Sequence, residues 1–181
     1  MRKVILDLAV TLDGFIEGPN GEVDWCIMDE EMDFAGFMSR LDTIFYGRIS
    51  YDGWGNYQPA ADAEPAEKEL WQDIHAKRKY VFSHQAKDNA NATYITTAIQ
   101  EKVAAIKQEE GKDIWLYGGA SLIRTFIELD LVDVYQLSVH PTVLGAGKPL
   151  FENLKERLTL TLKDTKVYKS GVVQFIYERQ V

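Results

Sequence analysis

The stretch that decides the fold is Ile114-Trp115-Leu116-Tyr117-Gly118-Gly119-Ala120-Ser121-Leu122-Ile123-Arg124-Thr125-Phe126. Its first four residues form a short apolar and aromatic run, which is typical of a buried strand. After the two glycines, apolar residues recur at helical spacing, namely Leu122, Ile123, Phe126 and Ile127. The sequence therefore predicts a strand, a tight turn and a helix, with the turn at the carboxyl end of the strand.

The turn in this stretch has the chemistry of an anion site. Gly118 and Gly119 lack a Cβ, so their backbone can take unusual dihedral angles and let a ligand approach closely. Ser121 is expected to cap the helix, whose first N–H groups have no intrahelical acceptor. A pyrophosphate would suit this position, although a glycine pair can also serve only a turn or close helix packing. The glycine-rich dinucleotide fingerprint and the phosphate loop with its lysine are both absent, so a nucleotide would be held in another way.

The composition excludes several classes of partner. The chain has 181 residues, which predicts a single domain spanning residues 1–181. A formal net charge of −8 argues against nucleic acid and anionic membranes, because both need a basic patch. The single Cys26 cannot form an internal disulfide, and the three histidines lack metal-ligand spacing, so no metal is expected. With no signal peptide and no apolar run of about 20 residues, we expect a soluble, cytoplasmic protein.

Strand and helix patterns alternate along the first two-thirds of the chain. Strands are expected at residues 4–10, 43–46, 79–84, 94–95, 114–117 and 132–139. Helices are expected at residues 29–41, 48–54, 66–77, 99–110 and after Gly119, with Pro65 opening the third. Residues 53–64 form the most loop-like segment, which we interpret as a flap. The β-rich runs at 158–162, 165–168 and 172–177, with a turn at 169–171, predict a closing hairpin.

This order of elements predicts a three-layer α/β fold. The sheet is expected to be mixed and mostly parallel, with helices on both faces and a C-terminal antiparallel hairpin. In open sheets of this type, ligands bind beyond the carboxyl ends of the strands. Three turns fall at that edge, namely Gly47-Arg48, Ser83-His84 and Gly118-Gly119. We therefore expect one ligand site where these turns converge.

Short motifs in this order give the chain a resemblance to a known family. They are Thr11-Leu12-Asp13-Gly14-Phe15-Ile16, Tyr46-Gly47-Arg48-Ile49-Ser50-Tyr51 and Tyr117-Gly118-Gly119-Ala120-Ser121-Leu122. Over essentially its whole length the chain resembles the dihydrofolate reductase superfamily, and within it the reductase domain of the bifunctional riboflavin-biosynthesis enzyme. The branch is indicated by the loop Leu144-Gly145-Ala146-Gly147-Lys148-Pro149-Leu150-Phe151, which is similar to the riboflavin branch.

The resemblance implies NADPH as the cofactor. It places the glycine-pair turn on the pyrophosphate, the turn after residue 46 on the phosphates and ribose, and the first strand and its loop on the nicotinamide carboxamide. The residues expected to bind the cofactor, including Ser83 and His84 of a third turn, are Ala9, Ile16, Gly47, Arg48, Ile49, Ser50, Ser83, His84, Tyr117, Gly118, Gly119, Ala120, Ser121 and Leu122. A 2′-phosphate needs a cation and hydroxyl donors, which Arg48, Ser50, Ser83 and His84 could supply. The alternatives are a surface ion pair for Arg48 and a solvated turn for His84. In relatives, the peptide between the paired glycines is cis.

On the substrate side, the resemblance points to acidic residues. Trp25, Glu30 and Phe34 are similar to the dihydrofolate reductase pattern of a tryptophan, an acid and an aromatic residue. Glu30 takes the place of the acid, which would bind the heterocycle and help deliver a proton. Asp29 or Glu31 could equally fill that role, and all three could simply begin a helix. Asp13 is a second candidate, either as a substrate contact or as a turn former.

The leading hypothesis is an NADPH-dependent reductase of a small heterocyclic substrate, most like 5-amino-6-(5-phosphoribosylamino)uracil reductase of riboflavin biosynthesis. The acid at Glu30 favours the folate branch, whereas the Asp13-Gly14 turn and the loop at 145–151 favour the riboflavin branch. The alternatives are a dihydrofolate reductase and a non-catalytic NADP(H)-binding module. We expect no deaminase domain in this chain, and a homodimer is implied by the resemblance alone.

Overall fold

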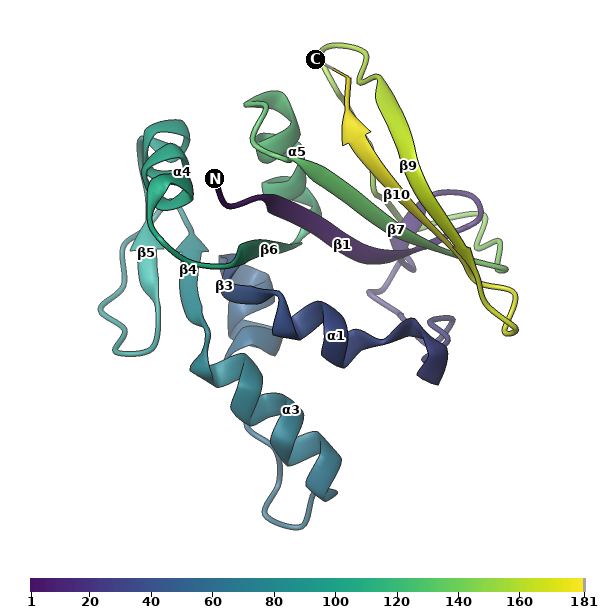
Figure 1. Ribbon diagram of the computed structural model, residues 1–181, viewed down its shortest axis with the longest axis horizontal. Coiled ribbons are helices and arrows are strands. Elements are labelled where there is room, and N and C mark those ends of the chain that lie inside the picture. Colours follow the sequence, from purple (N-terminus) through teal and green to yellow (C-terminus); the bar gives the residue numbers. More distant parts are fainter. Residues whose placement is uncertain (181) are drawn as a thin grey trace.

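The computed structural model describes residues 1–180, except for the side chain of Glu30. Its centre is an eight-stranded sheet in the order β5-β4-β3-β6-β1-β7-β10-β9 (Figure 1). The strands from β5 to β7 run parallel, and β10 and β9 complete the sheet in antiparallel orientation. The strands are β1 Val4–Thr11, β3 Leu41–Gly47, β4 Arg78–Phe82, β5 Thr93–Ile95, β6 Asp113–Gly118, β7 Val134–His140, β9 Leu160–Val167 and β10 Val173–Arg179.

Helices cover both faces of this sheet. Helices α4 and α5 lie on one face, and α1 and α3 lie on the other (Figure 1). The helical elements are η1 Glu30–Met32, α1 Phe34–Ser39, α2 Arg48–Ser50, the π-helical η2 Tyr51–Gly55, α3 Pro65–Ala76, α4 Ile99–Gln108 and α5 Ala120–Glu128. The predicted three-layer fold with a mixed sheet and a C-terminal hairpin is therefore confirmed.

Alternation along β1 explains how one strand contributes to both cores. Val4 and Leu6 belong to the core beneath α5, where they join Phe126. Ile5 points to the opposite face and joins Phe37 of α1. Because successive side chains of a strand point to opposite faces, a nearly continuous apolar run is what a strand buried on both sides requires.

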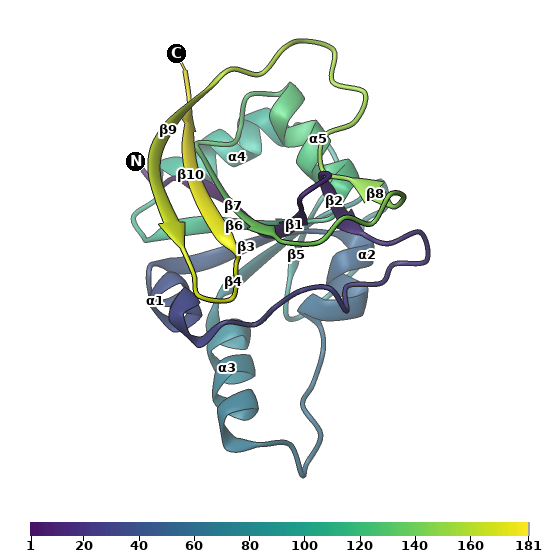
Figure 2. The same ribbon diagram turned by 90° about the vertical axis from the view of Figure 1, so that its right-hand side faces the viewer.

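Two short strands close the loops that follow the parallel strands. The strands β2 Phe15–Glu17 and β8 Lys148–Pro149 pair antiparallel in a second, two-stranded sheet. Figure 2 shows this pair beyond the end of β1, away from the β9–β10 hairpin. The glycine-rich loop predicted around residue 145 is thus held against the first loop.

The helix predicted at residues 29–41 is wrong in its extent. Asp33 has a φ of 48°, in the left-handed region, and separates η1 from α1. Its carboxylate accepts a hydrogen bond from the backbone N–H of Gly36, so it caps the second helix, while Asp29 caps the first by accepting from Glu31 N. Leu41 begins β3. The acidic cluster therefore supplies two caps, one for each short helix.

Two expectations at strand and helix ends also need correction. Ser121 does not cap α5, because Gly119 is the N-cap residue and Ser121 lies inside the first turn. The strand predicted to reach His84 ends at Phe82, so Ser83 and His84 belong to the following loop. Within residues 1–180, no helix is both long enough and apolar enough to span a membrane.

Candidate functional site

The turns after β3 and β6 touch at the carboxyl edge of the sheet. A Cβ on Gly47 would lie 3.3 Å from both the carbonyl oxygen of Gly118 and the backbone nitrogen of Gly119. A Cβ on Gly119 would lie 3.2 Å from Ser50 Oγ. The absence of side chains on these glycines therefore lets two turns, far apart in the sequence, form one surface.

The N-terminus of α5 opens onto this surface. The N–H groups of Leu122 and Ile123 both donate to Gly119 O, at 2.9 and 3.0 Å, and no side chain caps the helix. The Gly118–Gly119 peptide is cis, and Gly118 has a φ of +116°. Backbone N–H groups at an uncapped helix start, together with the helix dipole, favour an anion.

Aromatic packing supports the turn from beneath. Tyr117 stacks on Trp54 of η2 with ring centroids 4.5 Å apart and an interplanar angle of 16°. The ring centroid of Tyr117 also lies 5.3 Å from that of Tyr46. Burial raises the pKa of Tyr117 to about 12, so its hydroxyl stays neutral. Tyr117 therefore fixes η2 against β6, and the glycines that follow it form the open surface.

The polar residues expected around a 2′-phosphate are spread out along this edge. Arg48 is exposed and pairs with Asp52, one turn along, at 3.0 Å. Ser83 Oγ accepts from Gln85 N at 3.1 Å, and His84 is exposed. Within residues 1–180, no hydrogen bond joins Arg48 to Ser83 or His84. Ile49, which follows Arg48, is 77% exposed.

Asp13 joins the first loop to the glycine-rich loop. Its carboxylate accepts hydrogen bonds from Thr11 Oγ1 at 2.6 Å, Leu144 N at 3.2 Å and Gly145 N at 2.8 Å. The Thr11 bond is the main cause of a lowered pKa of Asp13; burial opposes it, and the backbone bonds from Gly145 and Leu144 lower the pKa further. These contacts give Asp13 a structural role, since three donors already occupy its oxygens. Ala9 on β1 and Ile16 on β2 lie partly buried on either side of this loop.

The acidic cluster expected on the substrate side is less informative. Glu30 begins η1, but its side chain lies outside the described part of the structure. Asp29 is used as the cap of η1, and Glu31 pairs with Lys169 on the β9–β10 turn at 2.6 Å. Both alternatives to Glu30 are therefore engaged in local contacts.

A row of polar side chains on the sheet face beneath α1 was missed by sequence reasoning. It is formed by Asp7 on β1, Gln136 and Ser138 on β7, and Gln174 on β10. Gln136 Nε2 donates to Asp7 Oδ1 at 2.7 Å, and Gln174 Nε2 donates to Ser138 Oγ at 3.1 Å. Buried polar groups on an otherwise apolar sheet face carry a cost and need partners. The one available signal was Asp7 itself, which interrupts the apolar run of the first strand.

Asp7 has an unusually high pKa for an aspartate carboxyl group. Burial raises its pKa to about 7, and the Gln136 hydrogen bond and the more distant Arg40 charge oppose that rise only in part. Asp7 and Ala9, the residue expected near the nicotinamide, point to the same face of β1. Their Cα atoms are about 7 Å apart, as for any residues two apart in an extended strand. A carboxyl group that titrates near neutrality can donate and accept a proton under physiological conditions.

His140 anchors the segment that crosses this face. The residue is 1% exposed, and its Nδ1 accepts from the backbone N–H of Ile27 at 3.2 Å, which leaves the ring proton on Nε2. Trp25 packs edge-on against the same ring at 5.3 Å. Burial lowers the pKa of His140, so the neutral form is favoured. The segment before η1 is therefore held over the polar row by a neutral histidine at the end of β7.

Comparison with known proteins agrees with this architecture. Uncharacterized protein YyaP of Bacillus subtilis (strain 168) is 57% identical over 177 residues, which cover 97% of this chain and 94% of that protein. The crystal structure of a candidate riboflavin biosynthesis protein from Shewanella sp. PV-4 matches with a TM-score of 0.79 at 21% identity, over 100% of both chains. A diaminohydroxyphosphoribosylaminopyrimidine deaminase/5-amino-6-(5-phosphoribosylamino)uracil reductase from Thermotoga maritima matches with a TM-score of 0.68 at 14% identity. That match covers 99% of this chain and 57% of the other.

The resemblance read from the three motifs is thereby confirmed at the level of fold and family. The structural matches extend over the sheet and both helical layers, and the family match begins two residues before β1 and ends within β10. Because the model of the RibD C-terminal domain matches residues 2–174, the chain belongs to the RibD C-terminal domain family.

Proposed function

We propose that this protein is an NADPH-dependent reductase of a small heterocyclic substrate. The observation that carries the proposal is the contact of Gly47 with the Gly118–Gly119 turn beside the uncapped start of α5. It provides a surface without side chains, next to free N–H groups, at the edge where ligands of open α/β sheets bind. The acid-bearing polar row begins on the neighbouring strand β1.

The residues present fit an extended dinucleotide. At Gly119 the backbone is open to close approach, with Ser50 Oγ as an adjacent hydroxyl. Ala120 and Ser121 would offer their N–H groups to the pyrophosphate, and Arg48 would turn from Asp52 to a 2′-phosphate. The exchange is feasible because an exposed ion pair of this kind contributes little stability. When bound, NADPH supplies the hydride, and the protein residues bind, orient and exchange protons.

The polar row is proposed to receive the heterocycle. Asp7, Gln136, Ser138 and Gln174 together offer carboxyl, amide and hydroxyl groups along neighbouring strands, the kind of edge that a pyrimidine or pteridine ring can pair with. Asp7 would give a proton to the nitrogen atom of the C=N bond whose carbon atom receives the hydride. Glu30 remains a candidate for the same task, whereas for Asp13 we favour the loop contact described above.

Within this class, the proposed substrate is a ribosylated aminopyrimidine. The proposal draws support from the family and from the Thermotoga maritima protein, whose name includes 5-amino-6-(5-phosphoribosylamino)uracil reductase. The second enzymatic candidate is dihydrofolate reduction, for which the acid at Glu30 is the sequence feature in favour.

Two measurements on the purified protein test the proposal. NADPH titrated against tryptophan fluorescence should saturate, because Trp54 lies directly beneath the glycine turn. Stopped-flow oxidation of bound NADPH should then be triggered by the aminopyrimidine and not by dihydrofolate. Oxidation by dihydrofolate alone would identify a folate reductase. Saturable binding without turnover of either compound would favour a non-catalytic NADP(H)-binding module, and absence of NADPH binding would contradict the proposal.

A further inference from the structure

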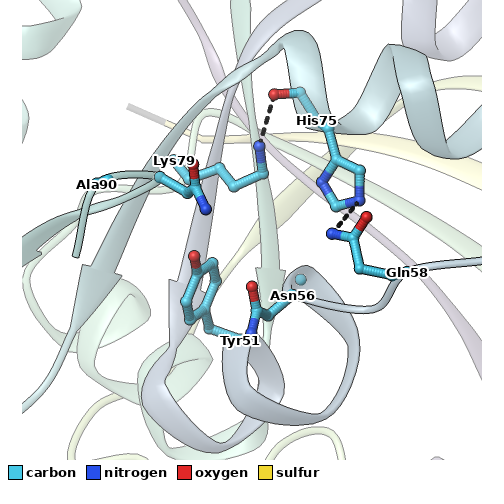
Figure 3. Close-up of a pocket in the computed structure, with 8 residues that line it drawn as sticks. Tyr51, Asn56, Gln58, His75, Lys79 and Ala90 are labelled. Carbon is cyan, nitrogen blue, oxygen red and sulfur yellow. Dashed lines mark hydrogen bonds between the residues drawn. The ribbon is translucent and has the colours of Figure 1, made fainter.

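A polar cavity of about 430 Å³ lies on the α3 side of the sheet, apart from the glycine turns. It is lined by residues of η2 and the segment after it, the end of α3, β4 and the loop between β4 and β5, and it is partly open to solvent. Figure 3 shows side chains gathered around it, and they include Tyr51, Asn56, Gln58, His75 and Lys79, with Ala90 at the rim. Of these, none is among the residues assigned above to the cofactor or the substrate.

Lys79 brings an uncompensated charge to this cavity. The residue is only 5% exposed, and among the described side chains no carboxylate lies within 4.0 Å of its Nζ. Its ammonium donates to the carbonyl oxygens of His75 at 2.9 Å and Lys77 at 3.2 Å. The neighbouring Lys77 is also buried, but its ammonium forms an ion pair with Asp73 at 3.0 Å. An ammonium has three N–H donors, so one is left over at Lys79.

The carbonyl groups that Lys79 contacts do not remove the need for an anion. They belong to the end of α3, where the helix dipole carries only about half an elementary negative charge. Burial, and then the neighbouring charge of Lys77, lowers the pKa of Lys79, as expected for an ammonium that lacks an anionic partner. Buried lysines are rare unless they are paired.

Tyr51 adds a second donor without an acceptor. The residue is 1% exposed, lines the same cavity, and its hydroxyl has no hydrogen-bond partner among the described residues. Burial raises the pKa of this hydroxyl, and the nearby side chain of Asn89, which does not reach hydrogen-bond geometry, opposes that rise in part. A buried hydroxyl without a partner costs free energy, so an acceptor in the cavity would stabilise it. The imidazole of His75 is already held by Gln58 at 3.2 Å and by Tyr57 O at 2.9 Å.

We propose that this cavity binds a small phosphorylated metabolite of sugar-phosphate size. Its phosphate would accept hydrogen bonds from the ammonium of Lys79 and the hydroxyl of Tyr51, and its hydroxyl groups would meet the side-chain amides of Asn56 and Gln58. Lysine binds phosphate as a compact point charge, and the amides can both donate and accept. The volume exceeds what a lone phosphate fills, which is why an organic remainder belongs to the proposal. This site is independent of the proposed reductase function.

The test is calorimetric titration of the intact protein with ribose 5-phosphate, inorganic phosphate and uncharged ribose. Ribose 5-phosphate should bind saturably, inorganic phosphate more weakly, and ribose not at all. Lys79→Met keeps the apolar stem and should raise the Kd for ribose 5-phosphate about tenfold or more. Tyr51→Phe removes one oxygen atom and should raise it about threefold to tenfold. Lys102→Met, at an exposed position of α4, is the matched control and should leave the Kd unchanged.

Backbone amide NMR locates the binding site and shows whether the variants are folded. On addition of ribose 5-phosphate, shifts should concentrate at Tyr51, Asn56 and His75, and the spectra of both variants should keep the dispersion of the wild type. If Lys79→Met fails to fold, Tyr51→Phe alone decides. Absence of saturable binding, an unchanged Kd in Tyr51→Phe, or shifts confined to the Gly118–Gly119 turn would each overturn the proposal.

Discussion

The side-chain amide of Gln136 donates a 2.7 Å hydrogen bond to Asp7 Oδ1 across the paired strands β1 and β7, where the two residues are direct register partners. Gln136 is itself 7% exposed, so this bond is made in the interior. It orients one oxygen of the carboxyl group and leaves the other available. Burial still dominates, since the pKa of Asp7 is raised to about 7 despite the bond.

The first prediction concerns stability and pH. The folded protein holds a proton on Asp7 that the unfolded chain, with a pKa of 3.8, has lost, so stability falls as pH rises from about 4 to about 7. At about 1.4 kcal/mol per pKa unit the full difference is ~4 kcal/mol, and the surface that Asp7 retains should reduce it to ~2 kcal/mol. Asp7→Asn should therefore be more stable than the wild type at pH 8 and nearly equal to it at pH 4. Urea unfolding at both pH values measures this, and a pH-independent difference would contradict it.

The second prediction concerns the choice of nucleotide. If Arg48 leaves Asp52 to hold a 2′-phosphate, Arg48→Ala should weaken NADPH by ~10-fold to 100-fold and NADH hardly at all, because one charge-assisted contact contributes ~1.5 to 3 kcal/mol. Fluorescence titration with both nucleotides gives the ratio. Lys87→Ala is the control, since Lys87 is exposed and lies 3.7 Å from the same carboxylate. An equal loss for the two nucleotides would assign Arg48 to the surface ion pair only.

The third prediction concerns the glycine turn. Gly119→Val should abolish NADPH binding and keep most of the fold, because even a Cβ there lies 3.2 Å from Ser50 Oγ and a branched side chain would project into the space in front of α5. Gly53→Ala is the control, as a Cβ on Gly53 would meet nothing within 4 Å. NADPH titration and circular dichroism of both variants are needed. Wild-type affinity in Gly119→Val would mean that the glycine pair serves packing.

The fourth prediction separates the candidate acids. Asp7→Asn should keep NADPH affinity but slow single-turnover oxidation of bound NADPH by ~10² to 10⁴, the range of general acid catalysis, with the loss largest below pH 7, where the wild-type carboxyl is protonated. Asp13→Asn should change the rate only a few-fold, through a looser first loop. If Glu30→Gln gives the large loss and Asp7→Asn does not, the substrate acid lies at the start of η1.

The sequence was sufficient for the elements that local pattern decides. The strand, turn and helix around Gly118 and Gly119 could be predicted because β6 and α5 both bury apolar residues at the spacing typical of a strand and of a helix. The helix at 29–41 was overextended because periodicity does not report a single left-handed residue such as Asp33. Ser121 was misread as a cap because the strand continues through Gly118, which moves the helix start to Ala120.

The candidate site was harder to predict, because its chemistry depends on neighbours distant in the chain. In the sequence, Asp7 only interrupts an apolar strand. Its hydrogen-bond partner, Gln136, lies 129 residues later in the chain. From the sequence, Asp13 could be either a substrate contact or a turn former, and its hydrogen bonds with Leu144 and Gly145 follow only from the pairing of two loops. A residue type at a strand end indicates where a site lies, whereas the state of its side chain is decided by tertiary contacts.

The position of β9 has a consequence for how this protein avoids aggregation. As the outermost strand of the sheet, it leaves one row of backbone N–H and C=O groups without a strand partner among the described residues, and nearly all of its own residues are exposed. Such an edge could template pairing with another chain, but Lys163, Asp164 and Lys166 place alternating charges along it. At the opposite edge, β5 is only three residues long. The two edges of the sheet therefore disfavour pairing with another chain in different ways: β9 carries charged side chains, and β5 is short.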